Sequence, residues 1–215
     1  MKFLVLGLLT TMGWAGTDPK PKASDYPAHG RAARAEIGAE YLSRTISEGG
    51  ESFYTGIYLV VEVAVYPDKG VTLPVSSGDF QLRINGKKVP LVAQTPGLVA
   101  AAMRNPEWER GNRGPTANVG LGGGDIIIGR PPAIERFPGD PQASRGPRPP
   151  QAPEQRDKAA QDQGEAALRL ALPQVEAETG VSGLVYFAYK SKLNDIRRLE
   201  LLYEGPAGRQ VLVLR

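Results

Sequence analysis

The chain of 215 residues carries 26 basic and 23 acidic side chains, which give a formal net charge of +3, and it contains no cysteine. Its basic residues are spread along the sequence, whereas nucleic-acid-binding proteins concentrate them on one face, so we expect no nucleic-acid partner. Without cysteine the protein forms no disulfide and has no thiol to carry a lipid anchor. After the first residues, no apolar stretch reaches the roughly 18 residues of a membrane span.

Residues 1–16 have the order of a secretory signal peptide. A lysine at position 2 precedes the apolar run 3–9, and small residues follow, so we expect cleavage near Ala15 or Gly16. The expected product is an exported, soluble protein, either periplasmic or extracellular. Residues 17–35 are polar and contain proline, which predicts a flexible leader before a single domain at 36–215.

The first half of that domain has the alternation typical of strands. Residues 57–66 are dense in β-branched side chains and predict a central strand, with a weaker candidate at 39–46. Residues 79–93 predict a hairpin around the turn dipeptide Asn85-Gly86. Pro90 lacks an N–H donor, so its strand is expected at a sheet edge or interrupted there.

The middle of the chain changes character. Of the 43 residues from 111 to 153, 18 are glycine or proline, which predicts a long loop, with a short strand possible only at 125–128. Residues 154–172 predict a helix that ends before Pro173. Its apolar face is narrow and lined by small side chains, so we expect it to pack closely on a sheet or to be marginal.

Three further strands are predicted at 183–189, 198–203 and 210–214, with a tight turn at 205–208. Seven or so short strands and one helix favour an antiparallel β-sandwich over a parallel α/β sheet. The predicted fold class is therefore mainly β, a sandwich with one helix and the long Gly/Pro-rich insertion.

Three sequence features together resemble exported bacterial immunoglobulin-like domains. They are the strand at 58–66, the Phe-x-Leu-x-Ile-Asn-Gly hairpin at 80–86, and Gly-Leu-Val-Tyr-Phe at 183–187 before a final Leu-Glu-Leu-Leu-Tyr strand. The resemblance covers about 36–95 and 180–215. It implies an immunoglobulin-like sandwich of a kind carried by many secreted proteins and lipoproteins.

Catalytic and metal-binding residues are scarce in this sequence. His29 is the single histidine, and it lies in the expected leader, where we interpret it as solvated. Glu62 interrupts an apolar strand and is interpreted as marking its solvent face. The glycine run at 120–124 precedes a strand and has no following lysine, unlike a phosphate-binding loop. We predict no catalytic residue, cofactor or metal.

The candidate partner-binding residues are Trp108, Arg110 and Arg113, beside the long loop, because an aromatic flanked by charges can anchor a partner. We therefore expect a non-enzymatic binding or accessory module whose partner is an envelope protein or glycan. Two alternatives stay open. One is a carboxylate-dependent glycan hydrolase, and the other is a structural subunit completed by strand exchange at an open sheet edge.

Overall fold

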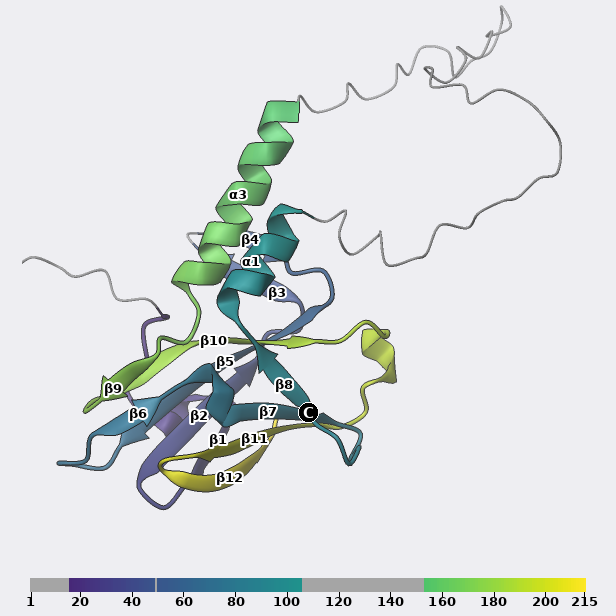
Figure 1. Ribbon diagram of the computed structural model, residues 1–215. Coiled ribbons are helices and arrows are strands. Elements are labelled where there is room, and N and C mark those ends of the chain that lie inside the picture. The colour runs from purple at the N-terminus through teal and green to yellow at the C-terminus, as the bar shows by residue number, and fades with distance from the viewer. Residues whose placement is uncertain (1–15, 49, 106–152) are drawn as a thin grey trace, which may run out of the picture.

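A computed structural model describes residues 16–48, 50–105 and 153–215. Its main element is an eight-stranded antiparallel sheet (Figure 1). In spatial order the strands are β1 (Ala28–Arg31), β2 (Ala35–Tyr41), β5 (Tyr58–Pro67), β10 (Val181–Ala188), β8 (Leu91–Gln94), β7 (Phe80–Ile84), β11 (Leu199–Gly205) and β12 (Gly208–Val213). Two small sheets pair β3 (Thr45–Glu48) with β4 (Glu51–Tyr54) and β6 (Leu73–Val75) with β9 (Val175–Ala177).

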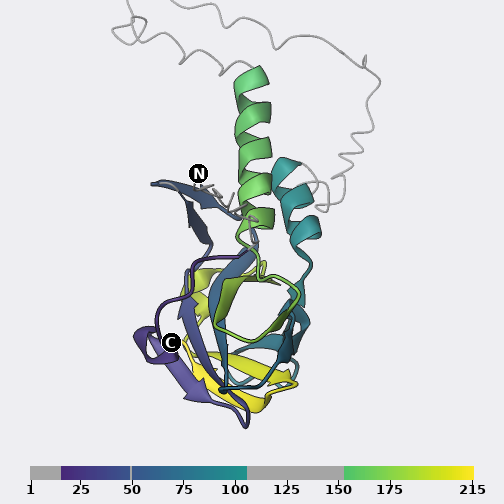
Figure 2. The same cartoon turned by 90° about the vertical axis from the view of Figure 1, so that its left-hand side faces the viewer.

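The large sheet curls until its two outer strands, β1 and β12, lie against each other (Figure 2). The amide of Arg34, just after β1, donates to the carbonyl of Ala207 at 3.1 Å. Gly30 of β1 lies so close to Gln210 and Leu212 of β12 that a Cβ there would overlap both side chains. The sheet is therefore nearly closed and barrel-like, and its two edges protect each other.

The predicted mainly β, antiparallel class is confirmed, but the immunoglobulin-like sandwich is not. A sandwich needs two separate sheets, whereas β8 pairs with β10 on one side and with β7 on the other. That short strand joins everything into one sheet. Alternating apolar residues specify which face of a strand is buried. A sandwich and a barrel-like sheet have the same alternation, so the sequence does not distinguish them.

The predicted strands of the sheet are largely confirmed. Residues 57–66 correspond to β5, and the C-terminal predictions correspond to β10, β11 and β12. Asn85 and Gly86 have φ of 51° and 68°, as the predicted turn requires. Pro90 does interrupt its strand, since β8 begins at the next residue, but β8 lies inside the sheet rather than at an edge.

The interior of the barrel-like sheet is apolar and contributed by alternate residues of nearly every strand. On β7, for example, Phe80, Leu82 and Ile84 point inward, while Gln81 and Arg83 point outward. Fully buried members of this core include Ile37, Leu59, Val61, Val63, Val65, Val185, Phe187, Leu199 and Leu201.

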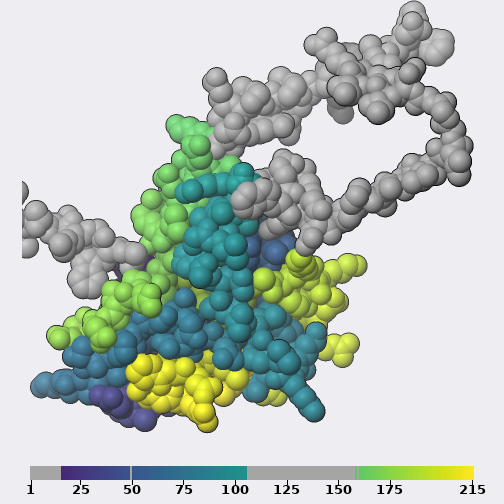
Figure 3. Space-filling model, in the orientation of Figure 1, coloured from purple at the N-terminus to yellow at the C-terminus, as the bar shows by residue number. Residues whose placement is uncertain are grey.

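Strands β5 and β10 are buried on their outer face as well. That face is covered by α1 (Pro96–Arg104), α3 (Pro153–Arg169) and the β3–β4 hairpin, which stand on one side of the sheet (Figures 1 and 3). The hydroxyl of Tyr186 donates to the carbonyl of Ala167 at 2.9 Å and joins sheet to helix. Burial raises the pKa of that hydroxyl well above its usual range.

The helix predicted at 154–172 corresponds to α3, which ends three residues earlier at Arg169, while α1 was missed. Gly164 of α3 lies against Arg104 and the carbonyl of Ala100, so small residues do allow close packing, chiefly against α1. In α1, Val99 and Met103 are one turn apart and face the sheet. A single pair at this spacing is too short a pattern to predict a helix.

The predicted flexible leader at 17–35 is wrong. This segment contains a 3₁₀ turn at Ala23–Asp25 and strand β1, which pairs with β2. Tyr26 is only 2% exposed and packs on Gly38, where a Cβ would lie 2.4 Å from its ring. The segment is mostly polar, so the few buried side chains that hold it against the domain do not form a pattern that the sequence reveals.

Other expectations fall where the structure says nothing. The Gly/Pro-rich segment lies outside the described residues except for Pro153, as does the expected strand at 125–128. Residues 1–15 of the expected signal peptide also lie outside them. Among the described helices, none is both long and apolar enough to cross a membrane.

Replacing Gly183 by alanine tests the close approach between β10 and the chain after α3. The new Cβ would lie 2.3 Å from Cα and 2.5 Å from N of Leu172, and backbone atoms cannot rotate away. We expect Gly183→Ala to lower the free energy of unfolding by about 2–3 kcal/mol, measured by urea denaturation. Gly97→Ala is the control, because open space surrounds that α1 position. Equal urea midpoints for the two variants would contradict the packing.

Candidate functional site

A polar cleft of about 910 Å³ lies where the β7–β8 turn meets the start of β11. A 3₁₀ turn at Leu193–Asp195 closes its other side. Most of its side chains are polar or charged, three of them arginines. The lining residues are Arg83, Asn85, Gly86, Asn194, Asp195, Arg197, Arg198 and Glu200.

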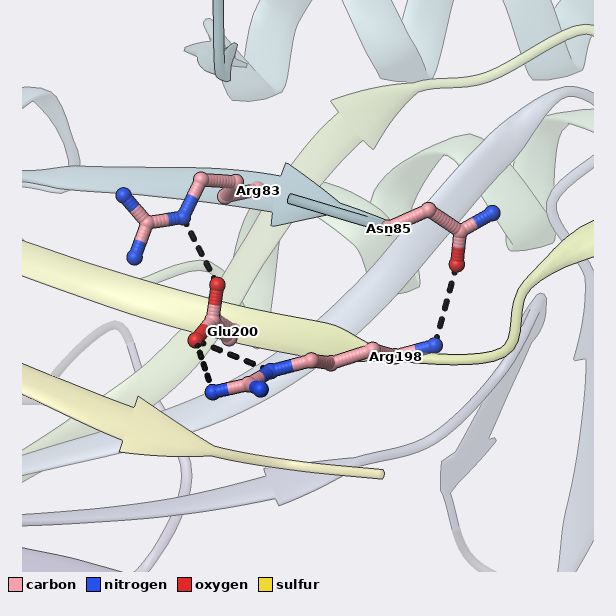
Figure 4. A network of polar contacts seen from close by, with 4 residues as sticks. All are labelled: Arg83, Asn85, Arg198 and Glu200. Atoms are coloured by element: carbon pink, nitrogen blue, oxygen red, sulfur yellow. Dashed lines mark hydrogen bonds and ion pairs between the residues drawn. The ribbon is translucent and has the colours of Figure 1, made fainter. Parts of the chain in front are cut away.

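Glu200 lies at the centre of this cleft and binds two arginines (Figure 4). Its Oε2 accepts from Nε of Arg83 at 2.7 Å, and its Oε1 accepts from Nε and Nη2 of Arg198 at 3.1 and 2.7 Å. The Glu200 side chain is 6% exposed, compared with 33% for Arg83 and 61% for Arg198. The carboxylate therefore lies at the bottom of the cleft, and the two guanidinium groups lie above it, where solvent reaches them.

The β7–β11 register places these groups. Glu200 is directly opposite Arg83, and both point to the outer face because Leu199, Leu201, Leu82 and Ile84 occupy the inner one. The Arg83 hydrogen bond lowers the pKa of Glu200, and Arg198 adds to the effect, while burial opposes both. The carboxylate is thus held in its charged form and fixes both arginines.

Asn85 joins the two segments that form the cleft. Its backbone has the left-handed conformation of the turn, and its amide donates to the carbonyl of Asp195 at 2.7 Å. Its Oδ1 accepts from the backbone N–H groups of Arg197 and Arg198 at 2.8 and 3.0 Å. This turn residue therefore aligns the chain that presents both arginines.

Charge in and around the cleft favours an anion. Three arginines face two carboxylates, so the lining has a net charge of +1. Lys87 and Lys88 extend the positive charge along the β7–β8 turn, and Lys192 does so immediately before the 3₁₀ turn; all three are exposed. In the sequence these basic residues are spread along the chain. The structure instead brings Arg197 and Arg198 beside Arg83.

Such an arrangement can bind an oxyanion. Arg83 uses Nε and Arg198 uses Nε and Nη2 for Glu200, and no described residue binds their other guanidinium nitrogens. The exposed Arg197 side chain likewise has no bound partner among the described residues. Planar guanidinium groups donate in pairs to phosphate or carboxylate oxygens, and donors already fixed in position lose less entropy on binding.

None of the described residues that line this cleft was a candidate site residue in the sequence. Trp108, Arg110 and Arg113 lie outside the described residues, so the structure does not test them. His29 is exposed on β1, with Nδ1 3.3 Å from the carbonyl of Tyr26. Among the described residues, no group of three or more metal-ligating side chains gathers.

Glu62 lies on the outer face of β5, as predicted, but it is half-buried rather than solvated. Its Oε1 accepts from Oγ1 of Thr17 at 2.7 Å. Glu40 of β2 is its register partner, and Oε2 of Glu40 binds Nζ of Lys20 at 2.8 Å. Both carboxylates are therefore already engaged by other parts of the fold.

No family model matches the chain, and no curated protein sequence matches it. Among solved structures, the chain is similar to ycdA of Bacillus subtilis, a protein proposed to be a lipoprotein. The two share 12% identity with a TM-score of 0.36, and the alignment covers 85% of this chain. This chain spans 37% of that protein's length.

Replacing Asn85 tests its role in forming the cleft. Asn85→Gly keeps the left-handed turn but removes the side chain's three hydrogen bonds, so we expect a loss of about 1–3 kcal/mol in unfolding free energy. Asn85→Asp is the matched control, since it keeps the Oδ1 acceptor for Arg197 and Arg198, and its loss should be smaller. Chemical denaturation of both variants measures the difference. A glycine variant as stable as the wild type would contradict the proposed alignment.

The lowered pKa of Glu200 predicts a pH-dependent contribution to stability. The unfolded carboxyl titrates near pH 4.3, so the folded-state contribution is complete above about pH 5 and declines as pH falls through the lower folded pKa. The stability difference between wild type and Glu200→Gln should therefore shrink between pH 6 and pH 3. Thermal denaturation across this range measures it. A constant difference would mean that Glu200 is not a stabilised anion.

Proposed function

We propose that the chain is an exported, non-enzymatic binding module that binds an anionic group in the arginine-lined cleft. The observation that carries this proposal is the pair of guanidinium groups fixed by one nearly buried carboxylate. A single negative charge leaves the pair with excess positive charge and with donors directed to the surface. Because Glu200 already holds both arginines, an anion that binds there has fewer side chains to order.

The position of the cleft agrees with a binding module. It is formed by a hairpin turn and a connecting loop at one end of the sheet, where rigid strands present variable loops. Export itself is proposed from the pattern of residues 1–16.

The two alternatives have less support. A glycan hydrolase needs two facing carboxyl groups free to act on substrate, but Glu40 binds Lys20 and Glu62 binds Thr17. A subunit completed by strand exchange needs an open edge, and in the large sheet β1 and β12 lie against each other. We therefore propose neither.

Isothermal titration tests the proposed function with inorganic phosphate, with polygalacturonate as a carboxylate polymer, and with neutral dextran. The wild type should bind at least one of the two anions and not dextran, and raising NaCl from 50 to 500 mM should weaken the binding. Arg197→Gln should reduce affinity by about 10- to 150-fold, because one charge-assisted hydrogen bond contributes roughly 1.5–3 kcal/mol.

A second variant removes the two arginines together with the carboxylate that holds them. Replacing Arg83, Arg198 and Glu200 together by glutamine removes the trio without leaving a buried charge unpaired, and it should abolish binding. Arg209→Gln is the control, because this exposed arginine of β12 pairs with Glu204 outside the cleft. Equal binding by the control and the trio variant, or no anion binding by the wild type, would refute the proposal.

A further inference from the structure

Strand β10 has an incomplete partner on one side. It pairs with β5 along its whole length, but β8 reaches it only at Tyr186 and Phe187. Elsewhere on this side, Leu184 exchanges hydrogen bonds with Leu170 and Leu172 in the chain after α3, and Ser182 pairs with Thr17. The N-terminal end of the described chain therefore completes the sheet at this point.

Thr17 is attached by both backbone and side chain. Its N–H donates to the carbonyl of Ser182 at 3.2 Å, and Oγ of Ser182 donates back to the carbonyl of Thr17 at 2.7 Å. Its own Oγ1 donates to Glu62 at 2.7 Å. Ser182 is 2% exposed, so this is a built site inside the fold rather than a surface contact.

Gly16 fits a position that only glycine can occupy. Its φ is +118°, and a Cβ there would lie 2.4 Å from the carbonyl oxygen of Ser182. Its nitrogen donates to the carbonyl of Arg169 at 2.7 Å. Arg169 is the last residue of the 17-residue helix α3, whose C-terminal carbonyls carry partial negative charge. A positive charge on this nitrogen would be stabilised there.

The sequence places a cleavage signal at the same residue. After the apolar run, Gly13 and Ala15 are small residues two apart, the pattern recognised before the cut bond of a secretory signal. We propose that the chain is cut between Ala15 and Gly16 and that the new N-terminal ammonium of Gly16 binds the carbonyl end of α3. This rests on the export part of the proposed function and not on the cleft.

The reaction is a peptide hydrolysis by a signal peptidase of the export machinery. Water adds OH to the carbonyl carbon of Ala15 and the C–N bond breaks. The Gly16 nitrogen takes the remaining hydrogen and is protonated by solvent. A peptidase must hold the residues on both sides of that bond, whereas in the folded protein Gly16 lies against Ser182 and Pro173. Cleavage is therefore expected before Gly16 docks against these residues.

Two measurements test the proposal. First, the full chain is expressed in a bacterial host, and the intact mass of the exported product is determined; the mass should correspond to a chain that begins at Gly16. An unprocessed chain overturns both the export and this proposal. Cleavage at another bond overturns this proposal alone, and titration of the cleft with phosphate remains a separate test of binding.

The second measurement compares thermal midpoints of proteins released from a fusion with defined first residues. The form that begins at Gly16 should melt about 2–4 °C above the form that begins at Ala15, because only the former places the ammonium at α3. In the form that begins at residue 16, Gly16→Ala should lower the thermal midpoint below that of the Ala15 form. Gly97→Ala should not lower it, because open space surrounds that position. Equal midpoints for the Gly16 and Ala15 forms would overturn the docking.

Discussion

The rest of the structure depends on the antiparallel pairing of β5 with β10, which is buried on both faces. Val61, Val63, Val185 and Phe187 point into the barrel-like core, and Val60, Leu184 and Tyr186 point to the helices and the β3–β4 hairpin. Burying both faces of two central strands removes more apolar surface from water than a one-sided sheet can. The barrel-like core and the layer of helices and hairpin therefore pack on opposite faces of the same two strands. Each layer is positioned by its contact with those strands.

The strands could be predicted from sequence because alternation with dense β-branching is a local property. The pairing could not, since nothing local in 91–94 shows that this short strand joins β10 to β7. The same limit explains the error at 17–35. Tyr26 is buried because Gly38 makes room for its ring, a fit between two segments that neither sequence shows alone.

The cleft was predictable only in its parts. Asn85-Gly86 identified the turn, but the sequence did not reveal that the Asn85 side chain holds Arg197 and Arg198. Arg83 and Glu200 are 117 residues apart and meet through the β7–β11 register, which follows from the inward apolar residues of both strands. In the sequence the charged residues of the cleft are simply spread along the chain, because a linear sequence does not show which of them the sheet brings together.

Glu200 is hard to explain by stability alone. On the outer face of the sheet, Glu200 lies between Arg83 of β7 and the exposed Val213 of β12. Ion pairs with exposed arginines contribute little to folding, and burying a carboxylate opposes it. What the carboxylate does provide is a fixed position for two guanidinium groups at the mouth of a cleft. A nearly buried charge that orders surface donors is the kind of departure from an apolar interior that marks a working site.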